Sequence, residues 1–150
     1  MTDFLIVRVM AKILIPFILI FGFYVQMHGD YGPGGGFQAG VIIASAFILY
    51  AMVFEIETAR RAIPMSILLL LACLGVLLYG GVGISNLIFG GEFLEYGTLS
   101  TDPKKGNHIG IIIIEIGVGI SVATVMLIIF FSFCKYYHDH SNNYNSPANK

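Results

Sequence analysis

Long apolar segments separated by short polar ones dominate the hydrophobicity pattern of this chain. A helix needs about 20 mainly apolar residues to cross the roughly 30 Å hydrocarbon core of a bilayer. Four segments reach or approach that length, at about residues 4–26, 37–54, 63–89 and 109–133. The pattern therefore predicts an all-α integral membrane protein with four transmembrane helices in a domain of residues 1–134. We expect the polar tail, residues 135–150, to be disordered.

Composition supports a membrane protein rather than a soluble one. Hydrophobic residues make up 57% of the chain and charged residues 11%, against roughly 45–50% and about 25% in soluble domains. The net charge of −1 includes no basic stripe, so nucleic acid is not an expected partner. Cys73 and Cys134 stand alone, without CxxC spacing, and we interpret them as reduced, packed side chains.

The distribution of lysine and arginine predicts the orientation. With both termini on one side, that side carries Arg8, Lys12, Arg60, Arg61, Lys135 and Lys150. The opposite side carries only Lys104 and Lys105. Because cytoplasmic loops of membrane proteins are enriched in these residues, we expect both termini in the cytoplasm and the chain in the cell membrane.

Glu115 is a lone carboxylate in the apolar run Ile111–Ile120. An ionisable group at membrane depth is costly, and such groups commonly mark an ion or proton path. The helical rise places Glu115 about 10 Å inward of His108 and Lys12 about 12 Å in from the other face, so we expect the two to meet near the middle of the membrane. Two interpretations stay open: a structural ion pair or protonated acid, and a proton or cation relay.

A glycine-rich segment, His28–Gly40, joins the first two predicted helices. It does not follow a strand or end in Lys-Ser/Thr, so it is not a nucleotide loop. The favoured interpretation is a tight turn, in which Pro33 fixes the backbone. The alternative is that Gly34, Gly35 and Gly36 present free backbone N–H groups at a helix N-terminus and attract an anion or carboxylate.

Small residues continue along the second and fourth helices. Gly36, Gly40 and Ala44 recur every four residues, and Gly117 with Ser121 repeats the spacing. Such grooves let membrane helices approach closely, so they predict helix–helix contacts.

Few residues suggest other chemistry. The polar residues of the outer face, His28, Asp30 and His108, could converge, but their spacing matches no recognised metal site and we expect them to be solvated. The sequence contains no nucleophile–base pair and no cofactor signature, so we expect no cofactor, no metal and no enzyme that acts alone.

Several motifs together resemble the B subunit of Mrp/Mnh-type multisubunit cation/proton antiporters. They are Pro16, Tyr24, His28-Gly29, the block Pro33–Gly40 with Phe37 at its centre, Phe93–Gly97, His108–Gly110 and Ile114–Val118. The likeness extends from about Arg8 to Phe133, and Ala39 replaces a glycine that is usual in the family. The resemblance implies a small four-helix component of a larger assembly that exchanges internal sodium for external protons.

The resemblance implies other antiporter subunits, membrane lipid, Na+ and H+ as partners. We expect Glu115 to contribute to a path shared with those subunits, Lys12 to set its protonation, and the glycine loop to seat the second helix against a partner. Two alternatives remain: a membrane subunit of a hydrogenase or complex I-like redox assembly, and a purely structural scaffold.

Overall fold

The computed structural model describes residues 2–29, 34–88, 90, 94–96 and 103–144. Within this part the chain forms helices and no strand, with bounds α1 Thr2–Met27, α2 Gly36–Phe54, α3 Ile56–Ala62, α4 Met65–Ile88 and α5 Pro103–Tyr144. Four of these helices, α1, α2, α4 and α5, are long and apolar enough to cross a membrane. The predicted all-α membrane protein with four transmembrane helices is therefore confirmed.

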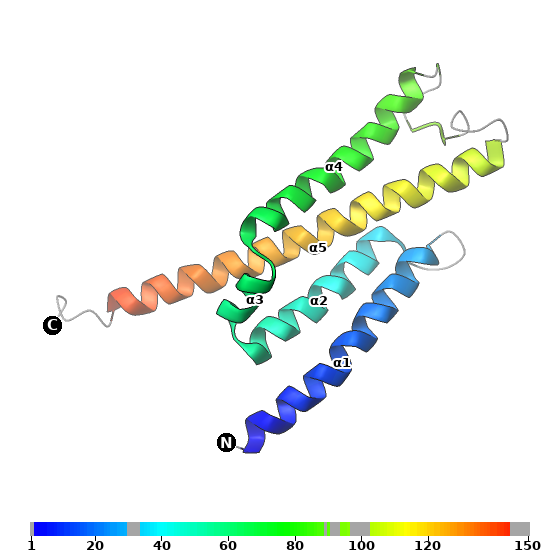
Figure 1. Ribbon diagram of the computed structural model, residues 1–150. Coiled ribbons are helices and arrows are strands. Elements are labelled where there is room, and N and C mark those ends of the chain that lie inside the picture. Colours follow the sequence, from blue (N-terminus) through cyan, green and yellow to red (C-terminus); the bar gives the residue numbers. More distant parts are fainter. Residues whose placement is uncertain (1, 30–33, 89, 91–93, 97–102, 145–150) are drawn as a thin grey trace.

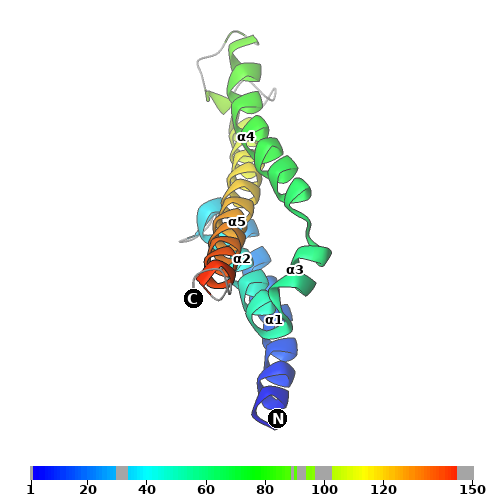
Figure 2. The same ribbon diagram turned by 90° about the vertical axis from the view of Figure 1, so that its left-hand side faces the viewer.

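The four long helices lie side by side in one row (Figure 1). The order across the row is α1, α2, α5, α4, so α5 packs against both α2 and α4. Turned by 90°, the row is a single thin layer (Figure 2). The start of α1, the end of α5 and the short helix α3 lie at one end of the row along the helix axes, here called the terminal end. The ends of α1 and α4 and the starts of α2 and α5 lie at the other, the loop end.

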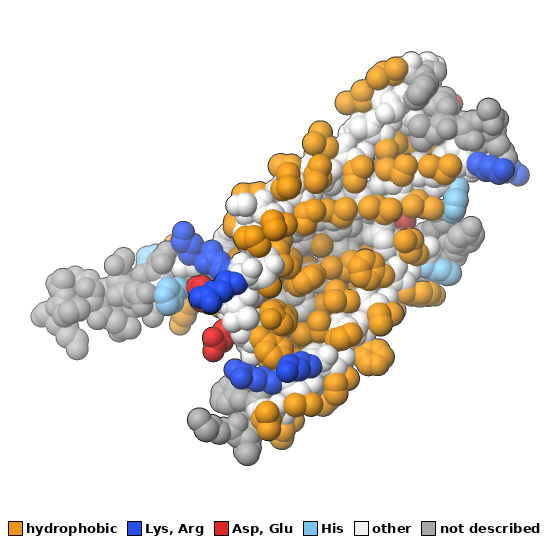
Figure 3. Space-filling view, viewed as in Figure 1, with side chains coloured by type: hydrophobic (Ala, Val, Ile, Leu, Met, Phe, Trp, Pro, Cys, Tyr) orange, Lys and Arg blue, Asp and Glu red, His pale blue; other side chains and the backbone are white. Residues whose placement is uncertain are grey.

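The single layer leaves apolar side chains exposed on its surface (Figure 3). Phe17 and Leu77, from α1 and α4, are each 67% exposed. Water could not cover such a surface at low cost, whereas lipid tails or other membrane helices can. The arrangement therefore suits a chain that is embedded in lipid or among other subunits.

Small residues bring α5 close to its two neighbours. A Cβ atom built on Gly40 of α2 would lie 2.7 Å from the carbonyl oxygen of Gly119, and one on Gly75 of α4 would lie 2.6 Å from the carbonyl oxygen of Gly117. These distances leave no room for a side chain, as is typical of close helix packing in membranes. Gly36, Gly40 and Ala44 are all buried in α2.

The short helix α3 closes the terminal end of the row. Its Ala59 is buried with Leu127 and Phe131 of α5 in the main apolar cluster. Glu55, just before α3, has a φ of 77°, a conformation that L-residues other than glycine rarely adopt. This turn reverses the chain sharply between α2 and α3.

Helix α5 is much longer than the predicted fourth span. It has 42 residues, or about 63 Å of rise, and it includes residues 135–144 of the tail for which we expected disorder. Neither glycine nor proline occurs between Gly119 and Pro147, so nothing in this stretch interrupts the helical hydrogen bonds. Residues 145–150 lie outside the described part.

Candidate functional site

The side chain of Glu115 points into a site made by three glycines. Gly29 follows α1, whereas Gly35 and Gly36 stand at the start of α2. A Cβ atom on Gly35 would lie 2.9 Å from Glu115 Oε1; one on Gly29 would overlap both carboxylate oxygens, and one on Gly36 the backbone carbonyl of Glu115. The carboxylate therefore occupies space that side chains would otherwise fill. We call Gly29, Gly35 and Gly36 the glycine cradle.

Backbone conformation explains why glycines occur at the start of α2. Gly34 and Gly35 have φ values of 154° and 141°, which glycine adopts without a steric penalty. The amide of Ala39 donates to the carbonyl of Gly35 at 3.0 Å, which closes the first turn of α2. Pro33, the other residue to which the sequence assigned this turn, lies outside the described residues.

The start of α2 favours a negative charge at this position. The first N–H groups of a helix have no intrahelical acceptor, and the helix dipole is positive there. The N-cap residue is Gly35, so no N-cap side chain accepts a hydrogen bond from these N–H groups. The Glu115 carboxylate lies against Gly35, which is the arrangement required by the interpretation of the loop as a carboxylate-attracting helix terminus.

Glu115 lies between two different environments. On one side is the N-terminus of α2, where the helix dipole is positive. On the other is the apolar surface of the membrane-spanning helix α5, in which Glu115 is half-buried.

The expected meeting of Lys12 with Glu115 is wrong. Lys12 Nζ lies 5.9 Å from the centre of the Phe54 ring, at the C-terminal end of α2. Glu115 lies against Gly36, at the N-terminal end of the same helix. The 19 residues of α2 separate these points by about 28 Å. The depth estimate failed because it assumed that α1 and α5 begin level with the two membrane faces, whereas α5 extends well beyond α1 and α2 at the loop end.

The outer-face polar residues do not form a metal site within the described part of the chain. The His28 ring stacks on Tyr24, with ring centres 5.1 Å apart. His108 is exposed near the start of α5, and Asp30 lies outside the described residues. In the ranges that the structure describes, no three His, Cys, Asp or Glu side chains are placed to hold one ion.

Gln26, which was not singled out in the sequence analysis, packs against α5 near Glu115. Its side-chain oxygen packs against Gly119, one turn along α5 from Glu115. Its Nε2 atom is buried and has no hydrogen-bond partner in the described structure. Gly117, by contrast, faces Gly75 and Leu78 of α4. Gly119, two residues from Gly117 and facing the opposite neighbour of α5, is the residue of the sequence that could have indicated this contact.

Other acids of the described residues lie outside the cradle. Glu55 and Glu57 flank the start of α3 at the terminal end. Glu95 precedes Tyr96, whose ring packs on Gly110, about 7 Å from Glu115 along α5. Burial, with a smaller contribution from Tyr79, raises the pKa of the Tyr96 phenol. Among the described residues, Glu115 supplies the carboxyl group that contacts the cradle glycines.

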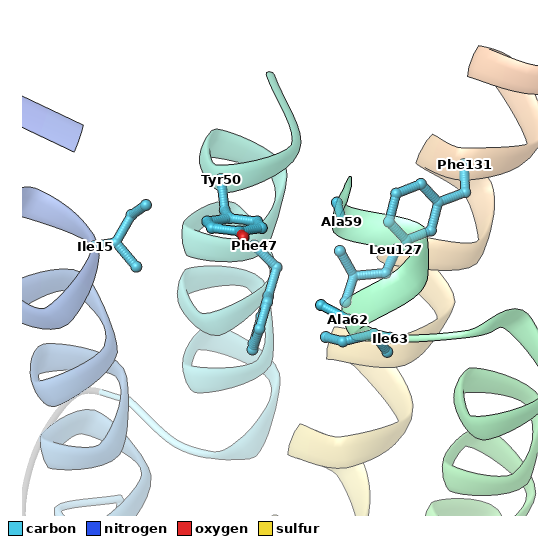
Figure 4. Close-up of a pocket in the computed structure, with 8 residues that line it drawn as sticks. All are labelled: Ile15, Phe47, Tyr50, Ala59, Ala62, Ile63, Leu127 and Phe131. Carbon is cyan, nitrogen blue, oxygen red and sulfur yellow. The ribbon is translucent and has the colours of Figure 1, made fainter. Parts of the chain in front are cut away.

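A small cavity at the terminal end has no polar lining. It has a volume of about 150 Å³. Figure 4 shows the residues around it, which come from α1, α2, α3, the residue after α3, and α5: Ile15, Phe47, Tyr50, Ala59, Ala62, Ile63, Leu127 and Phe131. Its surface offers no ligand for an ion, so we regard it as a packing gap beneath α3.

Comparison with known proteins gives one consistent result. A family profile described as "Domain related to MnhB subunit of Na+/H+ antiporter" matches residues 6–128. A protein of Staphylococcus aureus strain MRSA252 named "Putative antiporter subunit mnhB2" is 35% identical over 130 residues, which cover 85% of this chain and 92% of that protein. The protein of the same name in strain Newman is 34% identical over the same coverage.

Proposed function

Because the chain belongs to the family of the MnhB subunit of Na+/H+ antiporters, we propose that it is one membrane subunit of a multisubunit monovalent cation/proton antiporter. The assembly exchanges cytoplasmic Na+ for external H+. In this assembly the chain supplies Glu115 as a proton-binding group, and it does not transport ions alone.

The position of Glu115 in the glycine cradle is the observation that carries this proposal. The carboxylate lies at the start of α2 and beside the end of α1, where the backbone of Gly29 and Gly35 leaves room for it. α5 continues past this level, because Glu115 is about 18 Å from the first residue of α5. α4 also extends beyond the start of α2 at the loop end (Figure 1). The carboxyl group is therefore flanked by apolar helix on one side and by polar backbone on the other.

The single-layer arrangement supports a need for partners. An ion path through a membrane must be enclosed by protein or water on all sides. The row α1, α2, α5, α4 has a broad apolar face (Figure 3) and, among the described residues, no enclosed polar channel. Neighbouring subunits must supply the remaining walls and the further ionisable groups.

We assign the relay role to Glu115 without Lys12. At about 28 Å, Lys12 cannot exchange a proton with Glu115 directly. A change of protonation at Glu115 instead acts on its nearest neighbours, the first turn of α2 and the end of α1. Loss of the negative charge removes a favourable interaction with the α2 N-terminus, which couples proton binding to the contact between α2 and α5.

In the same proposal, the assembly lies in the cell membrane and both termini of this chain are in the cytoplasm. The terminal end carries Arg8, Lys12, Arg60, Arg61 and Lys135 among the described residues, and the loop end carries Lys104 and Lys105. The positive-inside rule supports a cytoplasmic terminal end. Blue side chains at the two ends of the row follow this distribution (Figure 3).

The experiment is to delete this chain from the host and purify the assembly from the parent strain in mild detergent. We expect other antiporter subunits to co-purify, and we expect Na+-driven proton movement in inverted vesicles to disappear on deletion and return on complementation. Co-purification with metal-cluster subunits would indicate a redox assembly instead. Normal exchange without the chain would refute the proposal.

A further inference from the structure

Lys12 has no role in the proposed relay, yet it is a cation within the apolar segment Leu5–Met27. Its ammonium group lies over the Phe54 ring at 5.9 Å. Among the residues that the structure describes, no carboxylate lies within ion-pair distance of it. A lysine near the end of a membrane helix extends toward the headgroup region, where it meets water or an anion.

A hollow adjoins this ammonium group between α1 and α2. It has a volume of about 380 Å³ and is lined by Lys12, Ile15, Pro16, Tyr50 and Phe54. The rings of Tyr50 and Phe54 stack with centres 5.0 Å apart and form one wall. Apart from the lysine and the tyrosine hydroxyl, the lining side chains are apolar.

Charge and apolar surface are ordered along the hollow. On α1, Lys12 is nearer the terminal end than Ile15 and Pro16; on α2, Phe54 is the last residue and Tyr50 is one turn deeper. The mouth at the terminal end is therefore positively charged and the deeper part is apolar. A phospholipid in the adjacent leaflet has the matching order, with its phosphate outward and its acyl chains inward.

Arg8 adds a second cation to the mouth. It precedes Lys12 by four residues on α1, and both side chains are exposed, so they share one face of the helix. Glu55, which follows the lining residue Phe54, is exposed and does not line the hollow. Lys12 is the charged residue of the lining among the described residues, which favours an anionic headgroup.

We propose that this hollow binds one anionic phospholipid, with the phosphate at Lys12 and Arg8 and an acyl chain against Ile15, Pro16, Tyr50 and Phe54. An acidic side chain from a neighbouring subunit would satisfy the ammonium group but would not fill the apolar hollow beneath it. The inference goes beyond the proposed antiport. It depends only on α1 and α2 crossing the membrane, so the two can fail separately.

The test uses the purified assembly that contains the full chain, reconstituted with phosphatidylglycerol or phosphatidylcholine that carries a photoreactive group in one acyl chain. After illumination, the labelled peptides are mapped by mass spectrometry. We expect phosphatidylglycerol to label the hollow at Ile15, Pro16 or Tyr50 in preference to phosphatidylcholine. K12Q and R8Q should each lower this labelling about fivefold, and K12R should retain it.

Lys135→Gln is the matched control, because it removes an exposed cation at the same end of the row but outside the hollow. We expect it to leave labelling unchanged. Equal labelling by the two lipids, or unchanged labelling in K12Q, would overturn the proposal. A zero-length cross-link between Lys12 and an acid of another subunit, with no lipid label in the hollow, would also overturn it and assign Lys12 to a protein contact.

Discussion

Glu115 and Gly35 touch across the contact between α5 and α2, where a Cβ atom on Gly35 would lie 2.9 Å from Glu115 Oε1. The relationship connects an ionisable group in one helix to the first turn of another. It also explains a glycine on each side of the α1–α2 connection, since Gly29 lies against the same carboxylate. Substitutions in the cradle should therefore disturb α2, whereas a substitution at Gly80, where a Cβ meets nothing within 4 Å, should not.

Gly36→Ala should destabilise the protein, because the new methyl group would overlap the carbonyl of Glu115 and push α2 away from α5. Overpacking of this kind lowers the free energy of unfolding by about 1–3 kcal/mol. Gly80→Ala is the control, since a Cβ there meets nothing within 4 Å and alanine favours the helix by up to about 1 kcal/mol. Thermal unfolding of the purified assembly measures both. Equal stability of the two variants would contradict the close packing at Gly36.

Lys12 and Glu115 should behave independently in a double-mutant cycle of K12Q and E115Q. They stand at opposite ends of α2, and sites more than about 10 Å apart usually show coupling within about 0.5 kcal/mol. The unfolding free energies of the four proteins, measured in one detergent, give the coupling energy. A coupling energy above about 1 kcal/mol would show that Lys12 and Glu115 interact directly, as the sequence suggested, and would contradict their placement here.

Glu55→Gly should stabilise the α2–α3 turn, since Glu55 has a φ of 77° that glycine adopts freely. The strain relieved is about 1–3 kcal/mol. Glu57→Gly provides the comparison: it removes the same charge two residues later, inside α3, and should cost about 1 kcal/mol. Changes of the same sign in both variants, in chemical denaturation, would show that the turn is not strained.

Orientation can be measured with single cysteines in a chain lacking Cys73 and Cys134. Lys105→Cys at the loop end should react with a membrane-impermeant maleimide added to intact cells. Arg61→Cys at the terminal end should react only after permeabilisation, because we place that end in the cytoplasm. Labelling of denatured protein controls for reactivity. The reverse pattern would invert the proposed topology.

The four long helices could be predicted from the sequence because the thickness of the bilayer sets the length of a membrane-spanning helix. Apolar runs of about 20 residues can satisfy their backbone in lipid only as helices, and all four expected spans correspond to helices in the structure. The ends of α5 were less predictable, since a polar helix can continue outside the membrane without any apolar pattern to mark it. Helix α3, with 7 residues, is too short to show a helical pattern of apolar residues.

The neighbours of each helix could not be predicted from one sequence. Glu115 stood out because an acid is rare in an apolar run, and the glycine loop because of its composition. That the loop attracts an anion or carboxylate was the less favoured of two interpretations. Nothing in the sequence identified Glu115 as that carboxylate or placed α5 between α2 and α4. Lys12 was paired with Glu115 in the sequence analysis from their estimated depths alone. In the structure the two residues lie at opposite ends of α2, so they do not meet.

The central claim, that Glu115 binds and releases a transported proton, is tested by Na+-driven proton movement in inverted vesicles that contain the complete assembly with E115Q. The amide keeps the shape of the side chain and cannot ionise, so packing against Gly29 and Gly35 is retained. Glu57→Gln, an exposed acid at the other end of the row, is the control. At equal assembly, the account predicts at least a tenfold loss of exchange in E115Q, or about 1.4 kcal/mol in the barrier, and normal exchange in the control. Undiminished exchange in E115Q would contradict it.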